Sequence, residues 1–414
     1  MPVFPRSIPV FGLIVLTMFA ATLLAPAYGQ DIVLDFLIVG NLQSWVNHLG
    51  DAEPGIDVTL VPGRAFFAGL SDEQLYRQIR IYFPRNMNSL LDYEVLLINA
   101  PRLDLFTGQQ QKMMVDFVGA RDKVSFGYPL STHAEVQDPW LASPLSKAFP
   151  VDYDRYVAES RASGFAEWWE NRPLRVVSDL PPVFTVFEET GIFDDRIYRT
   201  CRPCYAKEGA TIWIYMIEGP PGDPEEPAFI SWPYEGTDTW SFGVHPGYDR
   251  PQWQLAGDWW ELIFLNVCFY TLEWETFSLD EAVNARHVKV QLSHFQDFAS
   301  MFQSISDFVS RVGANTNQAQ STLREGFAVR DQAEAYYLEQ RYDEARDMME
   351  EALGLANQAM DEAKDAKDSA LLWIYVIEWM ATTATALMSG VVVWWLMIRR
   401  RLYREVTVTR LSDR

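Results

Sequence analysis

An apolar run close to the C-terminus, residues 379–398, places the strongest constraint on what this chain can fold into. A helix needs about 20 mainly apolar residues to cross the hydrocarbon core of a bilayer, and this run supplies them. A buried helix of a soluble protein, which is the alternative, rarely extends so far without a charge. We therefore predict a transmembrane helix over residues 370–398, with Glu378 near its outer edge.

The residues around this run predict its orientation. Aromatic residues occur toward both of its ends, as they do at the two interfaces of a membrane. Arg399, Arg400 and Arg401 follow it directly, and clustered positive charges remain on the cytoplasmic side. The sequence therefore predicts a single-pass protein of the cell membrane, with residues 399–414 as a short basic cytoplasmic tail and the N-terminal part outside.

Residues 1–29 have the three-part pattern of a secretory signal peptide. Arg6 precedes an apolar run over residues 8–24, and the small residues Ala27 and Gly29 suit a cleavage site. An uncleaved anchor helix is the alternative, although the apolar part is short for a full span. We predict a signal peptide over residues 1–29, followed by an ectodomain.

The charge of the chain excludes one class of partner. The formal net charge is −22, and a strongly acidic surface repels polyanions. We therefore expect no nucleic-acid partner.

Cys201 and Cys204 form a Cys-x-x-Cys pair. Outside the cell such a pair can close a small disulfide loop, and it is also half of a zinc site. Neither a second pair nor a nearby pair of histidines completes four ligands. We therefore expect a disulfide or free thiols here, and we predict no metal and no cofactor.

Residues 30–277 alternate strand and helix patterns. The predicted helices begin at the capping residues Ser71 and Thr107, and the apolar strands are bounded by turn residues. The strands expected first are 35–39, 56–61, 93–99 and 123–126, and those expected later are 211–216, 228–232 and 239–244. This alternation predicts an α/β domain with a mostly parallel sheet flanked by helices.

Residues 278–369 change to helical spacing. Apolar residues recur every three or four positions from Leu292 to Val309, and an Ala-rich seam follows from Ala345 to Ala363. We predict a helical hairpin or coiled-coil stalk that precedes the transmembrane helix. The seam either joins the stalk to a protein partner or a second copy, or packs within the chain, and the sequence leaves both open.

Several short phrases in residues 32–277 point to a known family. The first strand ends at Gly40, Phe83-Pro84 precedes the strand 93–99, and Asp116 opens a phrase Asp-Phe-Val that ends a helix; the segments 144–151, 229–232 and 240–243 match later strands. In these phrases the domain resembles class I glutamine amidotransferase-like domains with a flavodoxin-like sheet. The resemblance implies that fold and, in active members, glutamine hydrolysis by a cysteine and a histidine.

The chain lacks the cysteine that this chemistry needs. The segment 124–133, where the family carries its nucleophile on a strand-to-helix elbow, contains no cysteine. A serine can replace it only where a base lies within hydrogen-bond reach. The serine candidates are Ser125 and Ser131, with His133 or His245 as the base, and they define the alternative of an extracytoplasmic hydrolase.

A second set of candidates is rich in tryptophan. Aromatic faces bind sugars and peptides by stacking, while polar side chains at the edge fix orientation. The same tryptophans would equally pack the sheet against its last helix, and the sequence leaves this open. The candidates are Trp232, Trp240, His245, Asp249, Arg250 and Trp253.

The sequence thus predicts a membrane-anchored, extracytoplasmic and non-catalytic amidotransferase-like module that binds or assembles at the cell surface. The alternatives are the serine hydrolase and a sugar-binding receptor subunit. The lipid bilayer, contacted through one helix, and a protein partner or second copy, contacted through the stalk, are the expected partners.

Overall fold

The computed structural model describes residues 32–41, 49–50, 53–64, 70–128, 130–131, 133–162, 169–170, 174–193, 199–201, 204–217, 225–246, 254–311 and 316–411. The predicted signal peptide, residues 1–29, lies outside them. The chain divides into two compact units. The first is Met1–Ser293 with Asp331–Met349, and the second is His294–Arg330 with Glu350–Arg414.

The first unit is built on an eight-stranded sheet in the order β2-β1-β3-β4-β10-β9-β8-β6. The strands β2, β1, β3, β4 and β10 run parallel, and β9, β8 and β6 extend the sheet in antiparallel fashion. The prediction of an α/β fold with a mostly parallel sheet is confirmed, and the sheet is mixed. The strands are β1 (Leu34–Asn41), β2 (Ile56–Arg64), β3 (Val95–Asn99), β4 (Val124–Tyr128), β6 (Leu174–Val176), β8 (Thr211–Met216), β9 (Glu226–Tyr234) and β10 (Thr237–Phe242).

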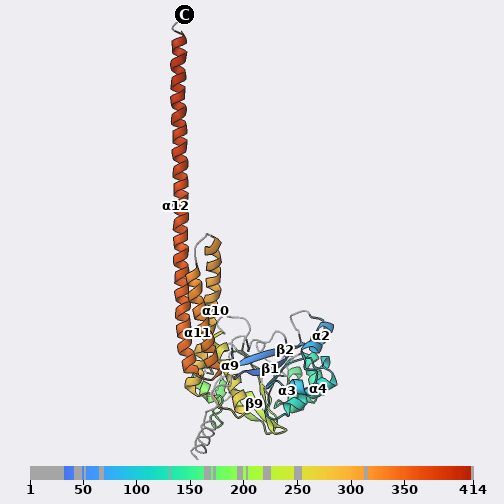
Figure 1. Ribbon diagram of the computed structural model, residues 1–414. Coiled ribbons are helices and arrows are strands. Elements are labelled where there is room, and N and C mark those ends of the chain that lie inside the picture. The colour runs from blue at the N-terminus through green and yellow to red at the C-terminus, as the bar shows by residue number, and fades with distance from the viewer. Residues whose placement is uncertain are drawn as a thin grey trace, which may run out of the picture. The chain divides into compact units, whose positions relative to one another are not determined.

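The central strands are apolar because helices cover both of their faces. Every residue of β3 and β4 is buried, which is typical of parallel strands between two layers. In Figure 1, α3 and α4 lie on one side of β1 and α9 on the other. The ring of Phe264 on α9 contacts Phe126 of β4 at 4.9 Å and Phe242 of β10 at 5.1 Å, measured between centroids.

Capping side chains set where the helices begin. Ser71 and Thr107 each form a capping box, with Gln74 and Gln110 respectively. The helices of this unit are α2 (Asp72–Tyr82), α3 (Met87–Leu91), α4 (Gly108–Val118), α5 (Ala134–Ala142), α6 (Leu145–Ala148), α7 (Tyr153–Ala162), α8 (Thr185–Glu188) and α9 (Gln254–Thr271), with a short η2 (Leu103–Leu105). A small antiparallel sheet has the order β11 (Val244–Pro246), β7 (Arg199–Cys201) and β5 (Trp169–Glu170).

Part of the predicted stalk belongs to this first unit. The unit includes the start of α10 (Leu279–Arg311), the end of α11 (Asn317–Leu338) and the start of α12 (Tyr342–Leu411). The backbone N–H of Ile32 donates to the carbonyl of Leu338 at 3.0 Å, and the ring of Tyr342 packs on Phe277. These contacts join both segments to the α/β part, and the first unit therefore extends beyond residue 277 to Ser293. The predicted division into ectodomain and stalk stays a prediction.

In the second unit, the remaining parts of α10, α11 and α12 pack on one another. The rings of Phe295 and Phe327 meet at 5.1 Å, and Thr322 donates to Glu362 at 3.0 Å. The Ala-rich seam is buried here, with Ala352, Ala356, Ala359 and Ala363 among its members. The seam therefore packs within the chain.

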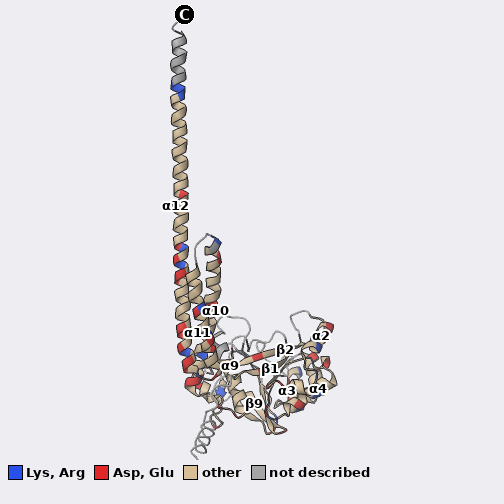
Figure 2. Ribbon diagram, in the orientation of Figure 1, with Lys and Arg blue, Asp and Glu red and all other residues tan. Residues whose placement is uncertain are grey.

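The helix α12 is 70 residues long and continues without a break beyond the bundle. Within the described residues, its part Tyr342–Arg401 is long and apolar enough to cross a membrane. Figure 2 shows that charged residues vanish from α12 after Glu378 and return only at the arginines from Arg399 onward.

Candidate functional site

The carboxyl edge of the parallel strands is where this topology favours a ligand site. The strand β1 lies between β2 and β3, so the strand order reverses direction at β1. Ligands of open α/β sheets bind outside the carboxyl ends of the strands at such a switch point. The strands that end here carry Asn41, Arg64, Asn99 and Tyr128 at their last positions.

Close packing at this edge depends on Gly40. A Cβ atom at this position would lie 2.1 Å from the carbonyl oxygen of Asn99, so only glycine fits between β1 and β3. The Asn99 side chain is itself buried, and its Nδ2 has no hydrogen-bond partner among the described residues. A buried amide donor without a partner destabilises the fold. The Asn99 amide is therefore a donor at this edge that a ligand could satisfy.

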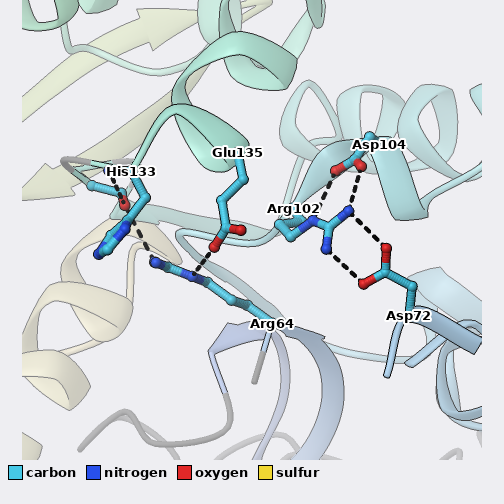
Figure 3. Close-up of polar contacts among 7 residues, drawn as sticks. Arg64, Asp72, Arg102, Asp104, His133 and Glu135 are labelled. Carbon is cyan, nitrogen blue, oxygen red and sulfur yellow. Dashed lines mark hydrogen bonds and ion pairs between the residues drawn. The ribbon is translucent and has the colours of Figure 1, made fainter. Parts of the chain in front are cut away.

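Arg64 is the cation of the site. It ends β2 and is only 7% exposed, and its Nη1 donates to the Ser131 hydroxyl at 3.2 Å. Its Nε lies 3.4 Å from a carboxylate oxygen of Glu135, on the first turn of α5 (Figure 3). The end of β2 is thus tied to the turn that connects β4 to α5.

Ser131 is held from several directions. Its hydroxyl oxygen also accepts from the backbone N–H of His133, at 3.3 Å, and its carbonyl oxygen accepts from Gln137 at 2.9 Å. A hydroxyl oxygen has two acceptor lone pairs, and here each meets a donor. These bonds fix the position of the Ser131 hydroxyl and use its oxygen as an acceptor.

A second arginine, Arg102, lies between β3 and η2, next to the end of β2. Arg102 makes a two-point ion pair with Asp72, at 2.7 and 3.1 Å, and donates to Asp104 at 2.8 and 3.4 Å (Figure 3). The hydrogen bond to Asp104, ahead of that to Asp72, raises the pKa of Arg102. These contacts join η2 to the start of α2.

The two serine candidates lie in different places. Ser131 and His133 are on the predicted strand-to-helix turn, next to Arg64. Ser125 instead lies inside β4, is 1% exposed, and has no hydrogen-bond partner for its hydroxyl among the described residues. Ser125 therefore belongs to the sheet interior. His245 is in β11, paired with Thr200, and the position of its side chain lies outside the description.

The structure does not bring the described tryptophan candidates together on an open face. Trp240 is fully buried, and its indole N–H donates to Thr271 at 2.9 Å. The ring of Trp232 is half-buried and lies 4.8 Å from the Lys207 ammonium. Asp249, Arg250 and Trp253 lie outside the described residues.

Lys207 carries a half-buried ammonium that the sequence did not reveal. Its ammonium donates to the carbonyl oxygens of Ser146, Lys147 and Phe149, at 3.0, 3.0 and 2.6 Å, and so closes the end of α6. Burial lowers the pKa of Lys207 to about 8, against the opposing effect of nearby acidic residues.

The thiol of Cys204 is buried and lies 3.9 Å from the carbonyl oxygen of Ala228. The side chain of Cys201 lies outside the description, so the disulfide between them stays a prediction. Cys268 is fully buried in α9, and burial raises its pKa well above the usual range. Among the described residues, no group of three or more His, Cys, Asp and Glu side chains is arranged to hold a metal ion.

A buried ionic network forms the second feature that the sequence did not reveal. The Lys289 ammonium lies 3.2 Å from the fully buried Glu53 carboxylate and also pairs with Glu261. The Tyr337 hydroxyl donates to the Glu53 carboxylate, at 2.8 and 3.0 Å to its two oxygens. The only sequence signal is that Lys289 follows Ala282 and Ala285 at helical spacing, on the buried face of α10.

A cavity of about 510 Å³ lies at the opposite, amino edge of β1 and β2. Asp35 and Asp57 line it, together with Tyr82 and Tyr93. Burial, followed by the charges of Glu94 and Asp57, raises the pKa of Asp35. This cavity is separate from the Arg64 cluster, and no candidate from the sequence lines it.

Comparison with known proteins leaves the family open. No protein-family model matches the chain, and no curated protein matches it. The cytoplasmic protein STM1381 from Salmonella typhimurium LT2 superposes with a TM-score of 0.38 at 14% identity, over 57% of this chain and 99% of that chain. Agd3, a carbohydrate deacetylase, superposes with a TM-score of 0.30 at 11% identity, over 58% of this chain and 32% of that chain. Both likenesses are too distant to carry an argument, and the amidotransferase resemblance stays a prediction.

Proposed function

We propose that this protein is a single-pass membrane protein whose amidotransferase-like α/β unit lies outside the cytoplasm and binds a ligand or partner without chemical turnover. One observation carries the membrane part. Every residue of α12 from Tyr375 to Arg401 is exposed, and almost all of those before Arg399 are apolar or small. Exposed apolar surface costs about 25 cal/mol per Å² in water, and lipid removes that cost.

Alkaline extraction of membranes tests the anchor. Wild-type protein should stay with the lipid pellet. Replacing Leu387 and Val391 with arginine should release the chain, because each charge costs roughly 2.5–3.5 kcal/mol at the centre of a membrane helix. The matched control replaces Glu351 and Asp365, which are exposed outside the apolar part of α12, with arginine. Release of the wild-type protein would contradict the proposal.

The geometry of Ser131 supports binding over catalysis. Its hydroxyl accepts from Arg64 and from the backbone of His133, so this serine is engaged as an acceptor. The unpartnered Asn99 amide offers a donor, and the buried Arg64 guanidinium adds positive charge at the same edge, which suits a ligand that carries carbonyl or carboxylate oxygens. The carboxyl edge is therefore the proposed binding site.

A serine hydrolase at this turn is the second candidate, favoured by the position of Ser131 beside His133 on a strand-to-helix turn. A fluorophosphonate probe distinguishes the two. The binding proposal expects equal labelling of wild type and Ser131→Ala, since neither holds an activated serine at position 131. Labelling that Ser131→Ala abolishes would instead establish the hydrolase.

A further inference from the structure

We infer that one face of α10 in the second unit joins two copies of this chain side by side in the same membrane. The face consists of Phe298, Met301, Ile305 and Phe308, which we name the outer seam. Met301 is 57% exposed and Phe308 is 48% exposed, while Phe298 and Ile305 are half-buried. The inference rests on the membrane anchor proposed above.

The outer seam is not needed for packing within the chain. The residues of α10 that pack inward are different ones, Phe295, Phe302 and Val309, and all are buried. Phe295, for example, meets Phe327 of α11. The seam is thus a second apolar face on a helix whose internal packing is already satisfied.

The spacing of the seam fits a parallel helix pair. Its residues follow one another at intervals of three, four and three positions, which is the repeat of the core positions in a coiled coil. In a two-fold pair of parallel helices each seam residue meets its own copy. A membrane anchor inserts every copy in the same orientation. The outer seams of two copies therefore lie at the same distance from the bilayer and can pair in parallel.

Charge also favours a second copy. The chain has a net charge of −22, yet the segment 298–310 contains a single charged residue, Asp307. Two copies therefore approach through this face with little like-charge repulsion. Depletion of charge at the centre is also a mark of protein interfaces.

The transmembrane part of the same unit allows close approach. Thr382, Ala386 and Gly390 recur every four residues along α12, and a Cβ atom on Gly390 would meet nothing within 4 Å. Small residues at this spacing let two helices pack tightly in lipid.

The size of the seam explains why the membrane is needed. From its aromatic and aliphatic side chains we estimate that a pair would bury roughly 300 Å² on each copy, against about 800 Å² per partner in a standard stable complex. The seam alone is too small for a tight soluble dimer. Confinement in one bilayer raises the effective concentration of the copies, which makes a second copy the occupant that fits.

Cysteine crosslinking of the full chain in its membrane tests the inference. Met301→Cys should give an oxidant-induced dimer at least about fivefold more abundant than the exposed control Gln303→Cys, because core positions of a parallel pair bring their Cβ atoms within disulfide reach. Adding Phe308→Glu to Met301→Cys should reduce the dimer at least about fivefold, since two carboxylates would then face each other. All variants keep the native cysteines, so wild type measures the dimer that these cysteines form on their own. Circular dichroism checks that the Phe308→Glu variant keeps its helix content.

Equal and weak dimer bands from Met301→Cys and Gln303→Cys would overturn the inference. A Met301→Cys adduct with a different protein, or protection of this cysteine by lipid without a dimer, would overturn it as well. Alkaline extraction of the same membranes separates the two proposals. A retained chain without the dimer defeats the seam and leaves the anchor standing. An extracted wild-type chain defeats the anchor and, with it, the pairing of copies in the membrane.

Discussion

At the scale of single residues, a buried ionic network stabilises the folded state of the first unit. It consists of Glu53, Lys289, Glu261 and Tyr337. Lys289→Met leaves two carboxylates near each other without their cation, one of them fully buried. Breaking such a buried pair costs about 3–5 kcal/mol, so we expect a clear fall in the temperature of unfolding. Tryptophan fluorescence of the full chain in detergent measures it.

Lys364→Met is the matched control for this prediction. Lys364 pairs with Asp361 on the exposed side of α12, at 2.9 Å. Exposed pairs contribute about 0–1 kcal/mol, so this change should leave the unfolding temperature nearly unaltered. Equal effects of the two substitutions would contradict the role given to the buried network.

Lys207 predicts a dependence of stability on pH. Its pKa is about 8 in the folded protein, lowered by burial from the ordinary 10.5, so between these values the unfolded chain binds a proton that the folded chain has lost. Stability from this group therefore rises with pH across the window. Chemical denaturation should show the free energy of unfolding of wild type increasing relative to Lys207→Met between pH 8 and 10.5. A difference that stays flat or shrinks would contradict the assignment.

Single residues of the site were only partly predictable. Ser131 and His133 were candidates because the segment 124–133 corresponds to the elbow of the resembled family, and their role stays a prediction. Arg64 was missed because its hydrogen-bond partner Ser131 lies 67 positions away, and only the assembled sheet brings them together. Lys289 was missed for the same reason.

At the scale of elements, the approach of β1 to β3 gives a sharp prediction. Gly40→Ala places a methyl group against the Asn99 carbonyl and should disrupt the pairing of these central strands. Such overpacking costs about 1–3 kcal/mol or more, and the unfolding temperature should fall accordingly. Gly108→Ala at the start of α4 is the control, since its added Cβ meets nothing within 4 Å. An unaffected Gly40→Ala protein would contradict the observed packing.

Strand patterns were predictable where the strands are central and apolar. The expected segments 35–39 and 93–99 correspond to β1 and β3, with small differences at their ends. The second strand, expected over 56–61, extends further, because β2 continues through Pro62 to Arg64. This strand is at the edge of the sheet, where proline needs no ladder partner for its nitrogen. The order of strands could not be predicted, because the pairing of β4 with β10 joins segments far apart in sequence.

At the scale of the whole molecule, α12 is one helix whose residues 342–349 belong to the first unit and whose remaining residues, the apolar span included, belong to the second. The sequence predicted the apolar span from its length and composition. It did not predict that residues 331–349 join the α/β unit, because that depends on contacts such as Tyr337 with Glu53.

The central claim is that α12 crosses the membrane with its basic end in the cytoplasm. Labelling of intact cells with a membrane-impermeant maleimide tests this directly, using Asp365→Cys before the span and Arg401→Cys after it, with wild type as the background for native cysteines. The account predicts that Asp365→Cys reacts in intact cells and that Arg401→Cys reacts only after lysis. Reaction of Arg401→Cys in intact cells, or protection of Asp365→Cys, would contradict it.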